Sequence, residues 1–455
     1  MAETKIERIS CSQIGEQYTH IQHKSGLSIY VSEMEGFSTT EALFGTKYGS
    51  INTQFKTKQE KDFCCVPEGI AHYLEHKLFE NEDCDVFDLY AKTGANANAF
   101  TSFDKTCYLF SCSSHYQESL EILLSFVQSP YFTKESVQKE QGIIGQEIQM
   151  CNDDPGWRIF FNTLQGLFHH HPVKIDIAGT IESIAQITPE LLYRCYHTFY
   201  NLHNMVLSVA GNCKVDEVVA LADKLLKPCE DMQLECIFPE EPMEIVRAET
   251  VETAPIGTTM FVLGYKCKPA SGLENLKKEL LATLALKVLT HVTSPLYQGM
   301  LKDGLINETF STEIFNGDDF FVPMLEGESK DPYAVRERIF AAVEEAAKNG
   351  LDETLFENSR KNAYGSLIMK FNNVEAVANL MINSAMSGIA PFDTVTMLSS
   401  LTIEDANRWL REELLPQQAT LSIMKIKQKG AGFRSGIPNQ NDVRAKRNSI
   451  PPSRN

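Results

Sequence analysis

Two stretches of the chain carry the same residues in the same order, 402 − 188 = 214 positions apart. In both copies a helical pattern leads into a strand pattern; the matched residues are Thr188, Glu190, Arg194, Leu207 and Ser208 in the first copy, and Thr402, Glu404, Arg408, Leu421 and Ser422 in the second. Upstream, at an offset of 365 − 145 = 220, Gly145 and Ile148 of one long predicted helix match Gly365 and Ile368 of another. The repeat predicts a duplicated α+β domain.

The first half shows both strand and helix periodicities. Residues 19–32 alternate as a hairpin that turns at 24–26, residues 41–48 read as a further strand, and residues 97–112 are strand-like. Helical periodicity covers 68–79, 85–93, 116–128 and 134–151. We therefore expect an α+β fold of two tandem homologous domains, each a mainly antiparallel sheet with helices packed on one face.

Between the halves, residues 228–249 contain Pro228, Pro239, Pro242 and several acidic residues, which interrupt both periodicities. The expected organisation is an N-terminal metal-binding domain at 1–235, a linker at 236–250, a homologous domain without a metal site at 251–430 and a tail at 431–455. The tail carries five Lys or Arg and one acid with almost no apolar residues, which predicts disorder. A basic arm for a polyanion is the less favoured interpretation.

Charge and hydropathy exclude several classes of protein. The 455 residues include 42 Lys and Arg against 60 Asp and Glu, a formal charge of −18, which argues against nonspecific nucleic-acid binding. No window reaches the roughly 18 to 20 apolar residues that span a membrane, and the polar N-terminus has no visible secretory signal. Twelve cysteines lie between Cys11 and Cys267 without a CxxC pair, so reduced thiols and a cytoplasmic protein are expected.

One short motif suggests metal chemistry. His72, Glu75 and His76 form an H-x-x-E-H pattern in a predicted helix, which places both imidazoles one turn apart on the same face. Glu75 lies on that side too and could accept a proton from water without being a ligand. By itself the motif could equally be a solvated helix face.

A catalytic zinc site needs a third protein ligand. The predicted helix at 140–152 offers Glu140 and Glu147, which are seven residues and thus two turns apart on one face. One of these glutamates could bind the metal while the other supports the site from behind.

With these residues in place, the chain resembles the family of pitrilysin, insulin-degrading enzyme and the mitochondrial processing peptidase, zinc peptidases with the inverzincin motif H-x-x-E-H. The resemblance extends to about residue 427; besides the motif and the glutamate pair it rests on Asn98–Thr101, His171-Pro172 with Gly179-Thr180, and Asn204–Gly211. Residues 76–102 are most similar to the bacterial YmfH-like subgroup, whose members are single half-length chains.

The resemblance implies a role for each matching residue. His72, His76 and Glu147 would bind one Zn²⁺ per chain, Glu75 would be the general base, and Glu140 would support the site from the second shell. The strand Asn98, Ala99, Phe100 and Thr101 would bind substrate by strand addition. Thr106 and Tyr108 could either contact substrate or pack within the strand.

The sequence departs from the family in one segment. Active members carry an Arg and a Tyr, seven residues apart, which hold substrate and the developing oxyanion. In the corresponding segment 294–311, Lys302 stands near the Arg position and no Tyr follows. We therefore expect a heterodimer with a zinc-less homologue that supplies this clamp; a homodimer is the second choice.

The resulting expectation is a zinc metalloendopeptidase that cleaves peptides or small unfolded proteins. A noncatalytic scaffold or core-type subunit is one alternative, and a dedicated processing protease for one precursor or protein-modification pathway is another. The triplet His169-His170-His171 precedes Pro172 after a helix, where loop histidines are common, so a second metal site is the weaker interpretation.

Overall fold

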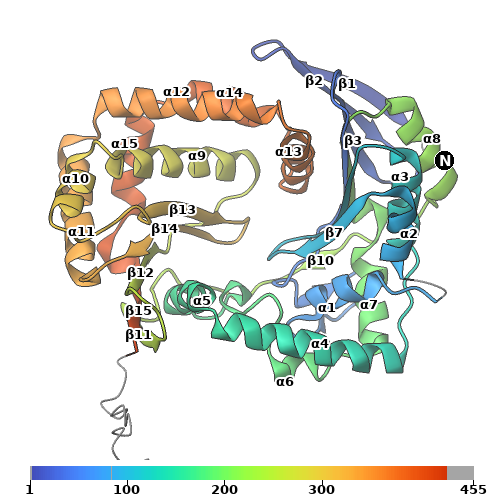
Figure 1. The fold of residues 1–455 in the computed structure, drawn as a ribbon, viewed down its shortest axis with the longest axis horizontal. Helices are drawn as coiled ribbons and strands as arrows, with labels where there is room; N and C mark the ends of the chain where they lie inside the picture. The colour runs from blue at the N-terminus through green and yellow to red at the C-terminus, as the bar shows by residue number, and fades with distance from the viewer. Residues whose placement is uncertain (1–2, 83–84, 428–455) are drawn as a thin grey trace, which may run out of the picture.

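The computed structural model describes residues 3–82 and 85–427, which form two halves, each built on a β-sheet (Figure 1). The predicted tail at 431–455 lies outside the described residues. Within the described ranges, none of the helices combines the length and apolar character that a membrane crossing requires.

The first half contains a seven-stranded sheet in the order β1-β2-β3-β9-β4-β8-β7. Its strands are β1 (Lys5–Cys11), β2 (Glu16–Gln22), β3 (Ser28–Glu33), β4 (Thr40–Thr46), β7 (Asn96–Thr101), β8 (Thr106–Cys112) and β9 (Met205–Gly211). A small second sheet joins β10 (Glu235–Cys236), β5 (Gln54–Lys56) and β6 (Cys64–Cys65). The predicted hairpin is present as β2 and β3, and the strand-like region 97–112 as β7 and β8.

The helices of the first half, with the exception of α5 (Pro155–Leu167), pack beside this sheet around a large apolar core. They are α1 (Ile70–Leu78), α2 (Val86–Thr93), α3 (Tyr116–Phe126), α4 (Lys134–Asp153), α5 (Pro155–Leu167), α6 (Ile181–Ile184), α7 (Pro189–Phe199) and α8 (Val215–Leu225), with the 3₁₀ turns η1 (Pro172–Lys174) and η2 (Leu202–Asn204).

The second half is built on a five-stranded sheet in the order β11-β15-β12-β14-β13. Its strands are β11 (Glu249–Ala254), β12 (Met260–Tyr265), β13 (Ser311–Asn316), β14 (Phe321–Glu328) and β15 (Ala419–Ile426). Its helices are α9 (Gly272–Leu289), α10 (Pro295–Lys302), α11 (Pro332–Asn349), α12 (Glu353–Lys370), α13 (Val374–Met386), α14 (Asp393–Ser400) and α15 (Ile403–Glu413), with the 3₁₀ turn η3 (Pro416–Gln418).

The two sheets share one topology. The order β3-β9-β4-β8-β7 recurs as β11-β15-β12-β14-β13, and in each sheet the first pair is parallel and the others antiparallel. Gly45 pairs with Val206 in the first sheet and Gly264 with Thr420 in the second, and 420 − 206 = 214 reproduces the sequence offset. The predicted duplication of an α+β domain is confirmed.

The halves exchange one helix each. α5 packs on β12 and β15 of the second sheet, and α13 packs on β4 and β9 of the first (Figure 1). Each helix packs closely on the sheet because the strand beneath it carries a glycine at the point of contact, Gly45 on β4 and Gly264 on β12. A Cβ on Gly45 would lie 2.5 Å from Met386 Cε of α13, and one on Gly264 would lie 2.6 Å from Thr163 Cγ2 of α5.

We expect Gly264→Ala to lower the free energy of unfolding by about 1–3 kcal/mol, because its methyl group would overlap Thr163. Gly365→Ala is the matched control: nothing lies within 4 Å of its Cβ position on α12, and alanine should stabilise the helix by about 0.5–1 kcal/mol. Urea unfolding of both variants measures the difference. Equal stabilities would show that the two halves do not need this close approach.

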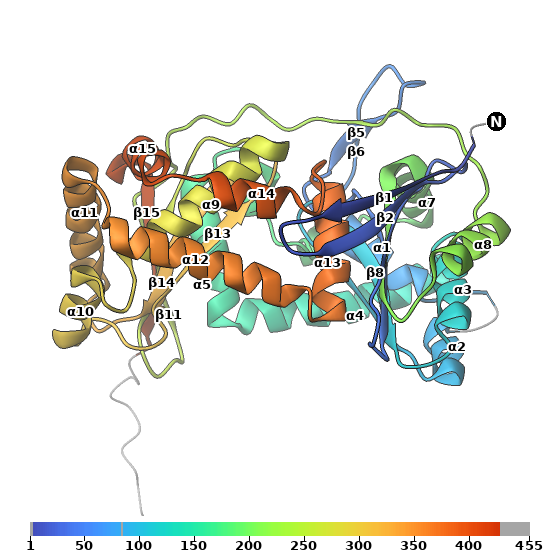
Figure 2. The same cartoon turned by 90° about the horizontal axis from the view of Figure 1, so that it is seen from above.

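An extended segment, residues 226–248, connects α8 to β11 across the molecule (Figure 2). Glu241 of this segment accepts backbone N–H bonds from His169, His170 and His171 at 2.6–2.8 Å, and its Oε1 lies 2.5 Å from the buried Lys266 Nζ of the second half. Despite the opposing effect of burial, Lys266 and these N–H groups lower the pKa of Glu241 to about 2. The histidine triplet thus helps to bind a carboxylate of the linker.

His171 should make stability depend on pH. The residue is 2% exposed, and burial lowers the pKa of His171 to about 4 from 6.5. Between pH 6.5 and pH 4, His171 is therefore protonated in the unfolded chain but neutral in the folded chain. The free energy of unfolding consequently falls as the pH is lowered through this range. The loss at pH 5 is about 2 kcal/mol.

The variant His171→Asn tests this contribution. Asparagine can keep an acceptor for the Val173 N–H, which His171 Nδ1 accepts at 3.1 Å, but it has no proton to gain. We expect the free energy of unfolding to fall less steeply between pH 7 and pH 5 in this variant. Identical slopes in urea titrations of the two proteins would contradict the expectation.

Candidate metal centre

The H-x-x-E-H residues lie on α1, whose start depends on a glycine. Gly69 precedes the helix with φ 85°, a left-handed conformation, and a Cβ there would lie 2.3 Å from the Ala178 carbonyl oxygen. The apolar residues of α1 enter the core of the first half. His72, Glu75 and His76 face the neighbouring helix α4 and the strand β7.

Helix α4 supplies the third candidate ligand after the two histidines. Thr133 caps its N-terminus, and the helix runs beside α1 so that Glu147 meets both imidazoles. Glu147 Oε1 lies 3.5 Å from His72 Nε2, and its Oε2 lies 3.6 Å from His76 Nε2. In residues 3–82 and 85–427, these three form the single cluster of His, Cys, Asp or Glu with all ligand atoms within 4.8 Å of one another.

This spacing fits zinc. Ligand atoms about 2.1 Å from a tetrahedral ion lie about 3.4 Å from one another, close to the two measured separations. Two imidazole nitrogens and one carboxylate also form the ligand set of several catalytic zinc sites, which keep a fourth position open. Interaction with His72 lowers the pKa of Glu147, so the carboxylate is ionised and able to bind a cation at neutral pH.

Glu140 contacts His76 through the ring nitrogen that does not face Glu147. Its Oε1 lies 3.0 Å from His76 Nδ1, which leaves Nε2 of that ring directed at Glu147. Although burial opposes both shifts, the hydrogen bond between the two groups lowers the pKa of Glu140 and raises that of His76. Glu147 thus faces both imidazoles and Glu140 contacts only His76, while the roles of the two glutamates in binding a metal stay a prediction.

We expect Glu140→Gln to weaken zinc binding by about 10–100-fold, because the amide cannot orient and polarise His76 as a carboxylate does. Competition with a chromogenic chelator measures the affinity. Glu135→Gln, in the exposed first turn of the same helix, is the control and should bind zinc as the wild type does. An unchanged affinity in Glu140→Gln would remove the supporting role.

Glu75 and Thr101 are joined by a hydrogen bond. Thr101 Oγ1 donates to Glu75 Oε2 at 2.6 Å, and the carboxylate lines a hollow of about 270 Å³ with His72, His76 and Glu147. Glu75 thus reaches the centre without belonging to the ligand cluster. Its second oxygen has no hydrogen-bond partner among the described residues and is free for a water molecule.

The strand predicted to bind substrate is an edge strand. β7 is the last strand of its sheet, so one side of Asn98, Ala99, Phe100 and Thr101 pairs with β8 and the other has no strand partner among the described residues. Thr106 and Tyr108 lie in the fully buried part of β8, where Thr106 donates to the Tyr48 carbonyl and Tyr108 bonds to Tyr200. Packing, rather than contact with substrate, explains these two residues.

Two residues beside the metal centre belong to no sequence motif that could have predicted their place there. Trp157 Nε1 donates to Asp176 Oδ2, and both side chains line the metal-centre hollow. Trp157 stands in the first turn of α5, which Asp154 caps, whereas Asp176 follows η1. Lys302 lies on α10, at the opposite end of the molecule from α1 (Figure 1).

Comparison with known proteins places this geometry in a family. Residues 67–181 match the family model described as insulinase, peptidase family M16, and residues 186–363 match the M16 inactive domain. The zinc protease YmfH of Bacillus subtilis, itself uncharacterised, is 38% identical over 421 residues, 91% of this chain and 98% of the relative. The chain belongs to peptidase family M16. The resemblance drawn from the sequence is confirmed.

Solved structures show the same architecture. An M16-like peptidase from Alicyclobacillus acidocaldarius matches with a TM-score of 0.86 and 32% identity, over 94% of this chain and 99% of that one. A protease from Helicobacter pylori matches with a TM-score of 0.74 at 19% identity, over 93% and 100% of the two chains, which supports the fold alone. The stretch that matches the M16 inactive domain, residues 186–363, runs from the end of the first half into the second and contains none of the three residues of the cluster.

Proposed function

We propose that this M16 protein is a zinc-dependent metalloendopeptidase that hydrolyses peptides or small unfolded proteins. The observation that carries the proposal is the spacing of His72, His76 and Glu147 around a common point, with the non-ligating Glu75 beside it. Its homologue YmfH bears the name of a zinc protease, which supports the same activity. We expect each chain to bind one Zn²⁺ ion.

The chain's own residues then perform distinct tasks. Bound zinc would supply a Lewis acid that polarises the scissile carbonyl and makes water more acidic. Glu75 takes a proton from the attacking water and returns it to the leaving amine, while Thr101 holds the carboxylate in place. The free edge of β7 binds the peptide main chain, which gives affinity without one required sequence.

Two alternatives remain within the family. A noncatalytic scaffold would be expected to lack a ligand or the base, and all four residues of the site are present, which favours an enzyme. A protease dedicated to one precursor or modification pathway would use the same centre, and its specificity would come from the surrounding chamber.

We further propose a heterodimer with a zinc-less homologue that supplies the missing Arg and Tyr, with a homodimer as the second choice. The position of α10 far from α1 supports an external source, because Lys302 cannot reach the centre of its own chain (Figure 1). We assign the protein to the cytoplasm, where the free thiols of its described cysteines would remain reduced.

The test measures zinc content and cleavage of quenched fluorescent peptides by the chain alone and mixed with its candidate zinc-less homologue. Cleavage should disappear on chelation and return with zinc. A mixture that holds stoichiometric zinc but cuts none of the peptides would refute the peptidase. Full activity of the chain alone would instead refute the need for a partner.

A further inference from the structure

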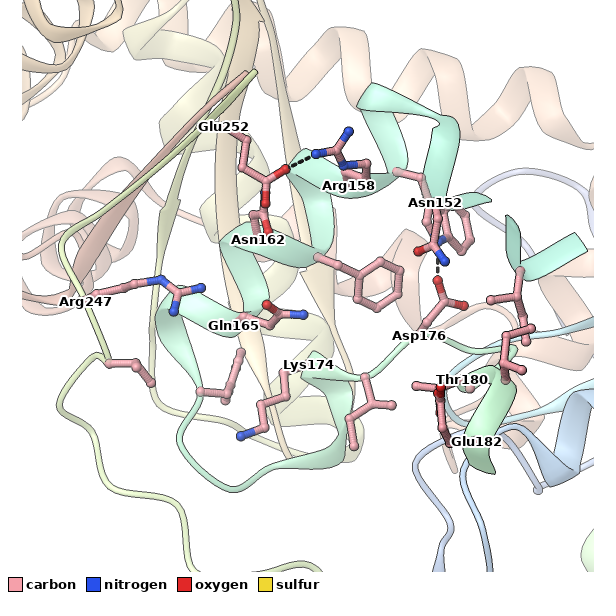
Figure 3. A pocket seen from close by; sticks show the side chains of 18 of the residues that line it. Asn152, Arg158, Asn162, Gln165, Lys174, Asp176, Thr180, Glu182, Arg247 and Glu252 are labelled. Carbon is pink, nitrogen blue, oxygen red and sulfur yellow. Dashed lines mark hydrogen bonds and ion pairs between the residues drawn. The ribbon is translucent and has the colours of Figure 1, made fainter. Parts of the chain in front are cut away.

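A second, larger hollow adjoins the metal centre (Figure 3). This outer hollow has a volume of about 950 Å³ and shares two wall residues, Trp157 and Asp176, with the metal-centre hollow. Its other walls come from α4, α5, the loop after α5, α6 and residues 246–252. The size is that of a pocket for a substantial ligand.

Three hollows follow one another along α4. The first is lined by Glu140 and Ile143, the metal-centre hollow by Glu147, and the outer hollow by Ile148 and Asn152. The ten residues from Ile143 to Asn152 span about 14 Å of helix, the length of about four residues of extended peptide. A peptide strand that lies on β7 and passes the metal centre would therefore continue into the outer hollow.

Of the cationic side chains in the outer hollow, Arg247 is the one best positioned to bind a ligand. Its backbone N–H donates to the Gly166 carbonyl at 3.1 Å, and its own carbonyl accepts the Thr420 hydroxyl at 2.8 Å. Its Nε donates to Thr250 Oγ1 at 2.7 Å, which fixes the plane of the guanidinium. The two terminal nitrogens have no partner among the described residues, so the side of Arg247 that suits a carboxylate is left free.

The neighbouring side chains are suited to the same ligand. Lys174 bonds only to the His169 carbonyl, whereas the third cation, Arg158, is neutralised by Glu252. In Figure 3, Arg247 lies on the left of the outer hollow and Lys174 near its lower centre, whereas the acidic residues Asp176 and Glu182 lie on the right. The side chains of Asn162 and Gln165, which have no hydrogen-bond partner among the described residues, line the same hollow and can bond to a peptide main chain.

We propose that the outer hollow is a substrate subsite that binds a carboxylate of the peptide, with Arg247 as its main partner and Lys174 as the second. The inference rests on the proposed peptidase function and adds a substrate class to it. The carboxylate has two sources: an Asp or Glu side chain near the scissile bond, or the C-terminus of a short peptide. Both offer two oxygens to the guanidinium.

The experiment compares kcat/KM for one cleavable peptide and its variants, using the chain in whichever assembly is active. One series places a Glu, a Gln or a Lys at each position on both sides of the scissile bond, and a second series compares the free C-terminus with its amide. The enzymes are the wild type, Arg247→Gln, Arg247→Glu, Lys174→Met and the control Arg408→Gln, an exposed arginine of α15 outside the hollow.

A Glu at one position should raise kcat/KM about tenfold over Gln, or the free C-terminus should do so over its amide, and the responding series identifies the source. Arg247→Gln should lose the preference, Arg247→Glu should transfer it to a Lys at the same position, Lys174→Met should reduce it, and Arg408→Gln should keep it. The subsite is refuted if cleavage proceeds without any preference for a carboxylate, or if the preference survives in Arg247→Gln. Absence of all cleavage refutes the proposed function instead.

Discussion

Replacing Glu75 by glutamine should lower kcat for peptide cleavage by about 10²- to 10⁴-fold while the protein still binds one zinc ion. Glutamine has the shape of the glutamate and can still accept the Thr101 hydroxyl, but it cannot take a proton from water. The proposed ligands His72, His76 and Glu147 are unchanged, so the variant should lose activity but keep its metal content.

The control variant is Glu68→Gln, whose side chain stands before α1 and outside the metal-centre hollow. It should retain both zinc and activity. Both variants are measured alone and mixed with the zinc-less homologue, by elemental analysis and by cleavage of a quenched peptide. If Glu75→Gln cuts peptides within tenfold of the wild type, another group is the base.

The second large effect concerns stability. Glu241→Gln should lower the free energy of unfolding by about 3–5 kcal/mol, because it leaves the Lys266 ammonium buried without a counter-charge. The side chain of Lys266 is 3% exposed and that of Glu241 13%, so water cannot replace the lost partner. The amide also places a donor where the carboxylate accepted the N–H groups of residues 169–171.

Two comparisons show whether the pair acts as a unit. Glu344→Gln breaks the exposed pair with Lys348 and should change the free energy of unfolding by less than about 0.5 kcal/mol. The double variant Glu241→Gln/Lys266→Met should be less destabilised than the sum of its single variants, because no unpaired charge remains. Strictly additive losses in urea unfolding would contradict this coupling.

The local parts of the site could be predicted because they depend on short spacings. A separation of four residues places His72 and His76 on one helix face, and a separation of seven does the same for Glu140 and Glu147. The duplication was readable because the same elements recur in the same order. The family resemblance also pointed to the substrate-binding strand, although only its pairing with β8 shows which side is free.

Other features depend on contacts that no local pattern encodes. α5 and α13 each present an apolar face, but the sequence does not state which sheet will cover it. Arg247 of the linker region lines the outer hollow together with residues of α5. Trp157 of α5 forms a hydrogen bond with Asp176, which lies in the loop after η1. The strand β1 was missed because its residues are mostly exposed and carry no alternating pattern.

The helix exchange links the metal centre to both halves of the molecule. Glu147 stands on α4, which ends at Asp153, and after one further residue the chain enters α5, which packs on the sheet of the opposite half. Cutting the connecting segment would therefore not release two separable domains, since each half would keep a helix that belongs in the other's core. The duplicated units therefore form an interlocked pair, in which a single residue, Asp154, joins the helix that carries the proposed ligand Glu147 to a helix packed on the second sheet.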